Sequence, residues 1–461
     1  MQTLITKYGL AAHLALLTVA PLFLFPFCGE GTITVVMLWL SGLAFIWILM
    51  EPSVLAGEVL HDARNRVSAN MFRDPLFWIS LVLIALAGVR AWNSGVTLAY
   101  DAEAMNWHLS SAALPLMPSS RDGEGKLLFA SAVALAVILQ GTRHAMGKSA
   151  RVAYALLASA MAGFSAVSAL LAFFSGHPGA TACVKFTAVN RDFAAIAFGV
   201  YSLVGTVALV GAFERRWNQA IPLLAFSIGG TGAGLFVFAD PAAVVVFVVA
   251  DLPVLLYSFF YAHRVLRSAG EFKCLVVFGI SVTIAVVLVI ALLPQSEVAA
   301  RVAPIVSNDL LPEKFMELRK TLGTLSLKAW RENPWLGTGL GTLASDLRLM
   351  AAEADWTLIP HGQSLALNGW WQLLVERGIV GAVAVALPLA LLLFTYGRSV
   401  CRWIFVHGLP HPMCLSGLFA LLAVVALAFV DATVLRPELV LIVCAMMAIS
   451  AHSFPKEKSN G

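Results

Sequence analysis

The sequence predicts an all-α polytopic membrane protein with about twelve transmembrane helices and one large, helical, outward-facing loop. Hydrophobic residues make up 60% of the 461 residues and charged residues only 12%, whereas a soluble domain has about 25% charged residues. Apolar segments long enough to cross about 30 Å of hydrocarbon recur along the chain. This composition excludes a soluble enzyme, a disordered chain and a nucleic-acid-binding protein.

Twelve segments have the length of about 20 largely apolar residues that a transmembrane helix needs. Nine of them fall within residues 1–293 and three within residues 378–461. The seventh and eighth are separated only by Asp240 and Pro241. The predicted segments are 10–28, 32–50, 75–92, 127–142, 152–175, 193–213, 220–239, 241–262, 274–293, 378–396, 413–431 and 435–453.

The distribution of Lys and Arg orients these segments, because cytoplasmic loops of membrane proteins are enriched in both residues. Sixteen of the 30 fall in one set of alternate connections, six in the other set, and eight in the long loop 294–377. Both termini, including the short tail that ends residues 378–461, are therefore expected in the cytoplasm. Loop 294–377 is expected on the outer side of the membrane.

The cysteines and the net charge indicate no further ligand. The six Cys residues show no C-x-x-C spacing, so neither a zinc site nor a redox pair is predicted. No metal and no cofactor is expected. The net charge of +4 is too small to indicate an anionic partner, and no nucleic-acid partner is expected.

Loop 294–377 is where function is expected, because a long loop among short connections usually carries it. Within it, residues 312–330 place apolar side chains on one helical face and basic side chains on the others. The pattern suits a helix on the membrane surface, and equally a helix packed on the transmembrane segments. The apolar face comprises Phe315, Leu318, Leu322, Leu325 and Ala329, and the basic residues are Lys314, Lys320, Lys328 and Arg331.

A glycine-rich segment, residues 333–341, follows this helix. Pro334 stops the helix, and three glycines at alternate positions allow a tight backbone course close to another segment or a ligand. The spacing is not G-x-G-x-x-G after a strand, so no nucleotide site is implied.

The stretch after Pro360 predicts a helix that runs through Glu376 and carries a polar stripe. At 100° per residue, four polar side chains lie within about 80° of one another. These are His361, Ser364, Asn368 and Gln372. A histidine at the outer face is a candidate general base, because its unperturbed pKa is about 6.5. The alternative is a histidine that only caps the helix.

Three features together resemble a known family: residues 333–341, His361, and residues 372–381. They are similar to the signature of the O-antigen ligase and O-antigen polymerase superfamily, which are bacterial integral-membrane glycosyltransferases of the GT-C type. The resemblance covers about fifty residues and agrees with many spans and a large loop before the last few. It implies a GT-C-like fold in the bacterial inner membrane, with loop 294–377 in the periplasm.

The resemblance implies a metal-independent transfer or polymerisation of a glycan carried on undecaprenyl diphosphate. The acceptor would be another glycan or lipid A-core, and membrane lipids would surround the protein. His361 corresponds to the family's loop histidine and is the expected catalytic residue. Asn368 and Gln372, on the same stripe, are expected to contact the substrate.

Basic residues are expected to bind the diphosphate, because guanidinium stays charged and binds phosphate oxygens bidentately. Arg191, within residues 189–193, resembles an arginine in the family segment at the outer end of the sixth span, and Lys185 lies nearby in sequence. Arg319 stands where family members often carry an arginine. Each also has a simpler interpretation as a basic residue that snorkels to the interface.

The sequence departs from the family pattern at one important place. Many members carry a Ser-Arg-Gly-like segment where residues 238–243 contain no basic residue. A second phosphate contact would then come from Arg90, Arg301 or Arg319, or the chain is a divergent or inactive member. The His-Asn doublets of many relatives are also absent.

Two polar features lie outside this pattern. Asp251 falls in the middle of the eighth span, and intramembrane acids are functional candidates by default; a local polar contact near Pro253 is the alternative. The connection between the third and fourth spans could shape an acceptor groove with Asp101, Glu103, Trp107 and His108.

Other functions remain open at the level of the sequence. A protein O-oligosaccharyltransferase belongs to the same superfamily and differs only in its acceptor. A twelve-span secondary transporter would have two similar six-span halves, and no internal repeat is evident. A peptidoglycan polymerase would also have a large outer loop, but its acidic motif is not evident.

Overall fold

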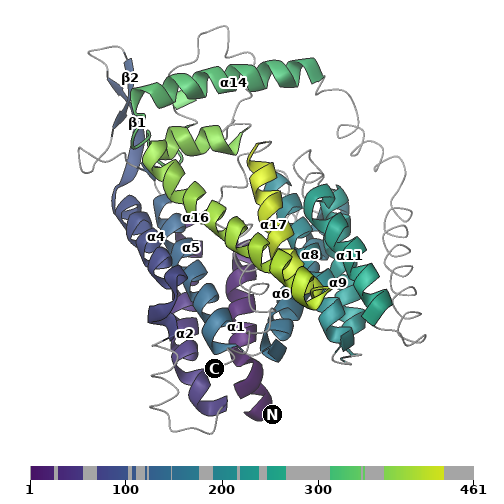
Figure 1. The fold of residues 1–461 in the computed structure, drawn as a ribbon. Helices are drawn as coiled ribbons and strands as arrows, with labels where there is room; N and C mark the ends of the chain where they lie inside the picture. Colours follow the sequence, from purple (N-terminus) through teal and green to yellow (C-terminus); the bar gives the residue numbers. More distant parts are fainter. Residues whose placement is uncertain are drawn as a thin grey trace.

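The protein is built almost entirely of α-helices, as its computed structural model shows (Figure 1). The structure describes residues 2–24, 30–55, 70–101, 106–110, 120–121, 124–146, 148–175, 191–214, 217, 219–237, 247–265, 312–343, 346–347 and 368–429. All structural statements below concern these residues.

The first half of the bundle is formed by five helices. Helix α1 (Gln2–Leu24) packs on α2 (Glu30–Leu55) and on α6 (Lys148–Ser175). Helix α5 (Glu124–Gln140) packs between α2 and α4 (Pro75–Trp92). Because each of these helices is apolar around much of its circumference, neighbours can cover several sides of it.

The second half is built around α8 (Arg191–Glu214) and α9 (Ala220–Val237), which pack on each other and on α6. A π-helical turn, η3 (Phe247–Asp251), leads into α11 (Leu252–Val265). Helix α17 (Pro412–Ala428) packs on α8, α11 and η3.

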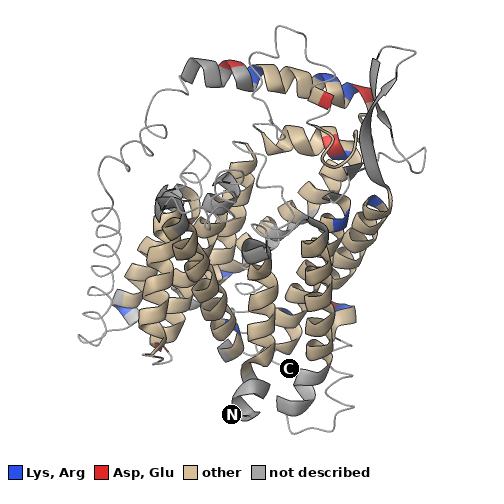
Figure 2. Cartoon of the chain, turned by 180° about the vertical axis from the view of Figure 1, so that it is seen from behind, with Lys and Arg blue, Asp and Glu red and all other residues tan. Residues whose placement is uncertain are grey.

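Two helices set the shape of one end of the molecule. Helix α14 (Pro312–Glu332) lies across that end, and α16 (Gly369–His407) starts beneath it and runs obliquely along the bundle (Figure 1). Charged residues gather on α14 and near the ends of the bundle helices, whose middle parts contain few charged residues in the described chain (Figure 2).

A small sheet was not anticipated by the prediction of an all-α chain. It contains β1 (Ser94–Asp101), β2 (Asn106–Ser110) and β3 (Ser120–Arg121) in the order β2-β1-β3. Strands β1 and β2 are antiparallel, with Tyr100 opposite Trp107, whereas β1 and β3 are parallel. The predicted acceptor-groove connection is therefore partly a hairpin at the α14 end of the bundle (Figure 1).

Ten of the twelve predicted segments overlap helices of the structure, while 274–293 and 435–453 lie outside the described residues. Six described helices are long and apolar enough to cross a membrane, and four shorter ones are also apolar. This supports the coarse prediction of a helical, membrane-type protein. The number twelve, the GT-C-like arrangement and the cytoplasmic termini stay predictions. The six windows are Thr32–Leu49, Pro75–Trp92, Gly125–Ala145, Ala150–Leu171, Ile196–Glu214 and Gly369–Leu387.

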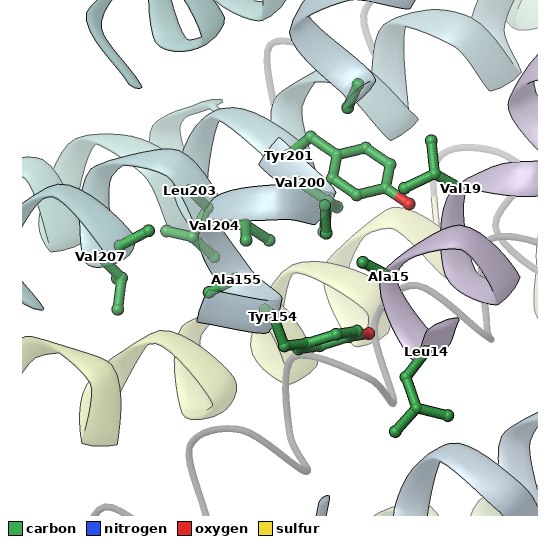
Figure 3. Close-up of a cluster of buried hydrophobic side chains, with 14 of the residues drawn as sticks. Leu14, Ala15, Val19, Tyr154, Ala155, Val200, Tyr201, Leu203, Val204 and Val207 are labelled. Atoms are coloured by element: carbon green, nitrogen blue, oxygen red, sulfur yellow. The ribbon is translucent and has the colours of Figure 1, made fainter. Parts of the chain in front are cut away.

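One continuous apolar core runs through the bundle helices, and it includes Tyr154 of α6 and Tyr201 of α8, which lie among apolar side chains near α1 (Figure 3). The hydroxyl of Tyr154 lies 2.6 Å from Thr18 Oγ1, and the hydroxyl of Tyr201 donates to the Thr18 carbonyl at 3.2 Å. Because buried hydroxyls need partners, these contacts hold α1 against both α6 and α8.

Small residues bring α6 and α9 into close contact. A Cβ atom added to Gly163 of α6 would lie 2.5 Å from the Cα of Ser227 in α9. Helices in membranes commonly pack through such small residues, because there is little hydrophobic driving force between helices surrounded by lipid.

Candidate functional site

The two segments that carry the family resemblance are bonded to each other at the α14 end of the bundle. We refer to residues 333–341 as the glycine turn. Its backbone forms four hydrogen bonds with residues 375–380 of α16. They run from Thr338 N to Val375 O (2.8 Å), Gly339 N to Glu376 O (3.1 Å), Ile379 N to Pro334 O (2.9 Å) and Val380 N to Trp335 O (3.1 Å).

A break in α16 makes this pairing possible. Gly378 has φ 63° and ψ −173°, which interrupts the helix. In an unbroken helix, the NH groups of Ile379 and Val380 would donate to the carbonyls of Val375 and Glu376. All four groups pair with the glycine turn instead, so the turn replaces the helical hydrogen bonds that the break removes.

The glycines are needed because the two backbones approach too closely for side chains. A Cβ atom at Gly337 would lie 2.5 Å from the backbone nitrogen of Arg377, and one at Gly378 would overlap the carbonyl of Trp335. The predicted close approach is confirmed, and the neighbouring segment is α16.

Helix α14 packs through its apolar face on the segment that contains the glycine turn and on the start of α16. Of the two predicted arrangements, a helix on the membrane surface or a helix packed on protein, the second is supported for the described part of α14. Its basic side chains at Lys320, Lys328 and Arg331 are exposed, as predicted. The side chains of Phe315 and Leu318 are outside the description. The small core contains Leu322, Leu325, Ala329, Leu343, Leu347 and Val375, with Trp330 packed against it.

Arg90, at the end of α4, reaches the glycine turn. Its Nη2 donates to the carbonyl of Leu336 at 3.1 Å. Arg377 and Glu376 are close enough to interact with it electrostatically. Two guanidinium groups and the carboxylate of Glu376 therefore lie at the turn.

Asn368 and Gln372, which were predicted to contact the substrate, both form hydrogen bonds with residues of α16. Asn368 is the N-cap residue, and its Oδ1 accepts from the NH groups of Trp370 at 2.9 Å and Trp371 at 3.2 Å. Gln372 donates through Nε2 to Glu376 Oε1 at 3.1 Å, and both side chains are buried. The predicted helix through Asn368 is wrong at this residue, because Asn368 is extended and α16 begins only at Gly369, so Asn368 and Gln372 do not share a helical stripe that starts at His361. These bonds orient the start of α16 and Glu376.

Asp346 is a buried acid near the glycine turn that the sequence analysis did not identify as a candidate. Thr342 Oγ1 donates to Asp346 Oδ2 at 3.1 Å and lies 2.8 Å from Thr338 Oγ1. Burial raises the pKa of the Asp346 carboxyl above its usual value, although hydrogen bonds from both threonines act in the opposite direction. The spacing of four residues from Thr338 to Thr342 and from Thr342 to Asp346 is the only signal in the sequence.

The remaining candidates are not placed relative to this unit. His361, Lys185 and Arg301 lie outside the described residues. Arg191 is the first residue of α8 and Arg319 lies within α14, but neither side chain is described. Of the sequence candidates, the structure therefore places Arg90 at the glycine turn and Gln372 in a hydrogen bond with Glu376, whose carbonyl is bonded to the turn. Residues 238–243, where the family arginine is missing, are also outside the description.

No protein-family model matches the chain, and a search of curated proteins found no match either. The resemblance to the O-antigen ligase and polymerase superfamily therefore rests on the motif residues themselves.

Proposed function

We propose that the protein is a membrane glycosyltransferase that transfers or polymerises a glycan carried on undecaprenyl diphosphate at the periplasmic face of the bacterial inner membrane. One observation carries the proposal. The two family-like segments, which flank residues 342–371 in the sequence, form a single backbone-bonded unit, and a basic side chain from α4 is bound to it.

In the proposed reaction, the acceptor hydroxyl attacks the anomeric carbon of the donor sugar. A new carbon–oxygen bond forms, the bond to the phosphate oxygen breaks, and the lipid diphosphate leaves with the bonding electrons. His361, seven residues before the cap of α16, accepts the hydroxyl proton as general base.

Arg90 is the best of the three alternatives for the missing family arginine. Its guanidinium is held at the glycine turn by Leu336 and lies near Arg377. Two neighbouring guanidinium groups favour a leaving diphosphate, because they stabilise the charge that develops on it in the transition state. Arg191 is proposed to bind the same group from the start of α8.

The proposal is tested in a strain that lacks the gene, by staining cell-surface glycan after expression of His361→Ala, Arg191→Ala or Arg90→Ala. Each arginine variant is expected to lose at least about tenfold of the glycan product, since a hydrogen bond to a charged group contributes about 1.5–3 kcal/mol. The variant His361→Ala is expected to lose at least about a hundredfold, since general-base catalysis contributes about 10²–10⁴-fold. Arg264→Ala is the matched control, because Arg264 stacks on Phe260 at the other end of the bundle.

Protein levels are compared in the same membranes by immunoblotting. Wild-type glycan from both His361→Ala and Arg191→Ala, at normal protein levels, would remove the proposed site. Loss of glycan in the Arg264→Ala control would show that the assay reports folding and not the site.

A further inference from the structure

Asp251 is a buried acid that the proposed reaction does not use. It is the last residue of η3, so its side chain projects from a π-helical turn immediately before α11. The residue is 5% exposed, and both carboxyl oxygens are buried without a hydrogen-bond partner. The interpretation as a local polar contact near Pro253 is therefore wrong within the part of the chain that the structure describes.

The helices packed against η3 supply no charge to Asp251. These are α8, α11 and α17, and none of their described titratable side chains forms a hydrogen bond or an ion pair with it. The flanking residues Ala250 and Val254 belong to the apolar core. The titratable side chains concerned are Tyr201, Glu214, Tyr257, Tyr261, Arg264 and Cys414.

An ionised carboxylate is expensive in this place. Removing an unpaired charge from water costs several kcal/mol even after the protein relaxes, and a neutral carboxyl avoids most of that penalty. Along α11, Asp251 lies 13 residues before Arg264, which corresponds to about 20 Å. The acid is therefore well inside the apolar bundle and away from its charged end.

A proton suits this site better than a metal ion. Hard cations such as Ca²⁺ or Mg²⁺ take about six or more oxygen ligands, and the described residues contain no group of three His, Cys, Asp or Glu side chains that could hold a metal. A proton needs only one carboxyl oxygen.

We propose that Asp251 is a proton-binding site inside the helical bundle and is a neutral carboxylic acid in this conformation. Release of the proton would place an unpaired charge between η3 and α17. Proton occupancy and the packing of this turn are therefore thermodynamically linked. The site is separate from the glycine turn and does not depend on the glycosyltransferase activity.

A membrane-permeant hydrophobic carbodiimide tests the site in the full-length protein reconstituted in lipid. A neutral carboxyl gives its proton to a carbodiimide nitrogen, its oxygen adds to the central carbon, and the adduct rearranges to a stable N-acylurea. Mass spectrometry of peptides is expected to find the adduct on Asp251 and none on Asp251→Asn. Asp74, which is ion-paired with Arg143, is the internal control and is expected to stay unmodified.

Infrared spectroscopy covers the case in which the reagent does not reach the site. The carbonyl stretch of a protonated carboxylic acid is expected in the wild type near neutral pH and is expected to be lost in Asp251→Asn. An adduct or this band, present in the wild type and lost in the variant, supports the proposal. Absence of both overturns it, as does an adduct on Asp74 equal to that on Asp251.

Discussion

Two glycines determine how the glycine turn meets α16. Gly337 and Gly378 have φ values of 76° and 63°, and residues other than glycine adopt such positive-φ conformations at a cost of about 1–3 kcal/mol. Each also stands where a Cβ atom would overlap the opposite backbone. These positions serve a contact between two protein segments, which is why glycine is required there even without a ligand.

Replacing Gly378 by alanine is expected to separate the turn from α16. At φ 63° and ψ −173°, Gly378 has a backbone conformation that is almost restricted to glycine and costs other residues about 1–3 kcal/mol. The added methyl group also collides with Trp335, so at least some of the four backbone hydrogen bonds are lost. A lower melting temperature in detergent and faster proteolysis within residues 333–341 are the expected readouts.

The matched control lies on the same helix. A Cβ atom at Gly397 meets nothing within 4 Å, and alanine is favoured over glycine in helices by about 1 kcal/mol. Gly397→Ala is therefore expected to keep or slightly raise the melting temperature. A Gly378→Ala protein that melts and is cleaved like the wild type would contradict the assigned contact.

For single residues, the sequence predicted where the backbone is close to another segment better than it predicted what each polar side chain binds. The close approach of the glycines follows from their type, and it was found. The roles of Asn368 and Gln372 depend on which atoms lie nearby in the fold, and a helical stripe cannot distinguish a ligand contact from a cap. Arg90 was one of three alternatives, because nothing in the sequence indicates that α4 ends beside the turn.

At the scale of elements, the side chain of Asp74 connects the start of α4 to the end of α5, at the end of the bundle opposite α14. Asp74 caps α4 by accepting from the NH group of Leu76 at 3.1 Å. It also lies 2.6 Å from Arg143 Nε and 3.1 Å from His144 Nε2. Both partners belong to a π-helical turn, η1 (Gly141–Ala145), at the end of α5.

The stabilising effect of Asp74 is expected to depend on pH. Burial alone would raise the pKa of Asp74, but Arg143, the NH group of Leu76 and His144 together hold it below its usual value of 3.8. The folded state therefore binds this proton less readily than the unfolded state. The contribution to stability is complete above the unfolded pKa and is lost as the pH falls through the folded one.

The variant Asp74→Asn measures this contribution, because asparagine keeps the N-cap acceptor but removes the charge. Near pH 7 it is expected to be less stable than the wild type by about 1.5–3 kcal/mol. The difference is expected to shrink below about pH 4 and to vanish at lower pH, in thermal unfolding followed by circular dichroism. A difference that stays constant down to that pH would contradict an ion-paired carboxylate.

The sequence predicted those helices whose hydropathy signal is averaged over many residues. Hydropathy over about 18 residues found ten segments that overlap described helices, because transmembrane helices are defined by length and apolarity. The turns η1 and η3 shift the hydrogen bonding by a single residue, and such a shift leaves no compositional trace. The hairpin of β1 and β2 was missed because its strands are short and lie in a polar connection.

The whole molecule has two charged ends with an apolar bundle between them (Figure 2). One end carries α14, the glycine turn and Arg90. The opposite end carries Asp74, Arg143 and Arg264. This arrangement suits a membrane-crossing bundle. Which end faces outward follows only from the excess of Lys and Arg in alternate connections, and it stays a prediction.

Helix α16 offers a direct test of that orientation, because it connects the two ends. From Gly378 at the glycine turn to Cys401 there are 23 residues, which correspond to about 35 Å along the helix axis, so Cys401 lies far from the glycine turn. Cys401 is exposed, as is Lys320 on α14. In a protein with all other cysteines replaced, a membrane-impermeant maleimide applied to right-side-out vesicles is expected to label Lys320→Cys at once. Cys401 is expected to react only after permeabilisation. The opposite result, immediate labelling of Cys401 and protection of the cysteine at position 320, would reverse the predicted orientation and move the proposed site to the cytoplasmic face.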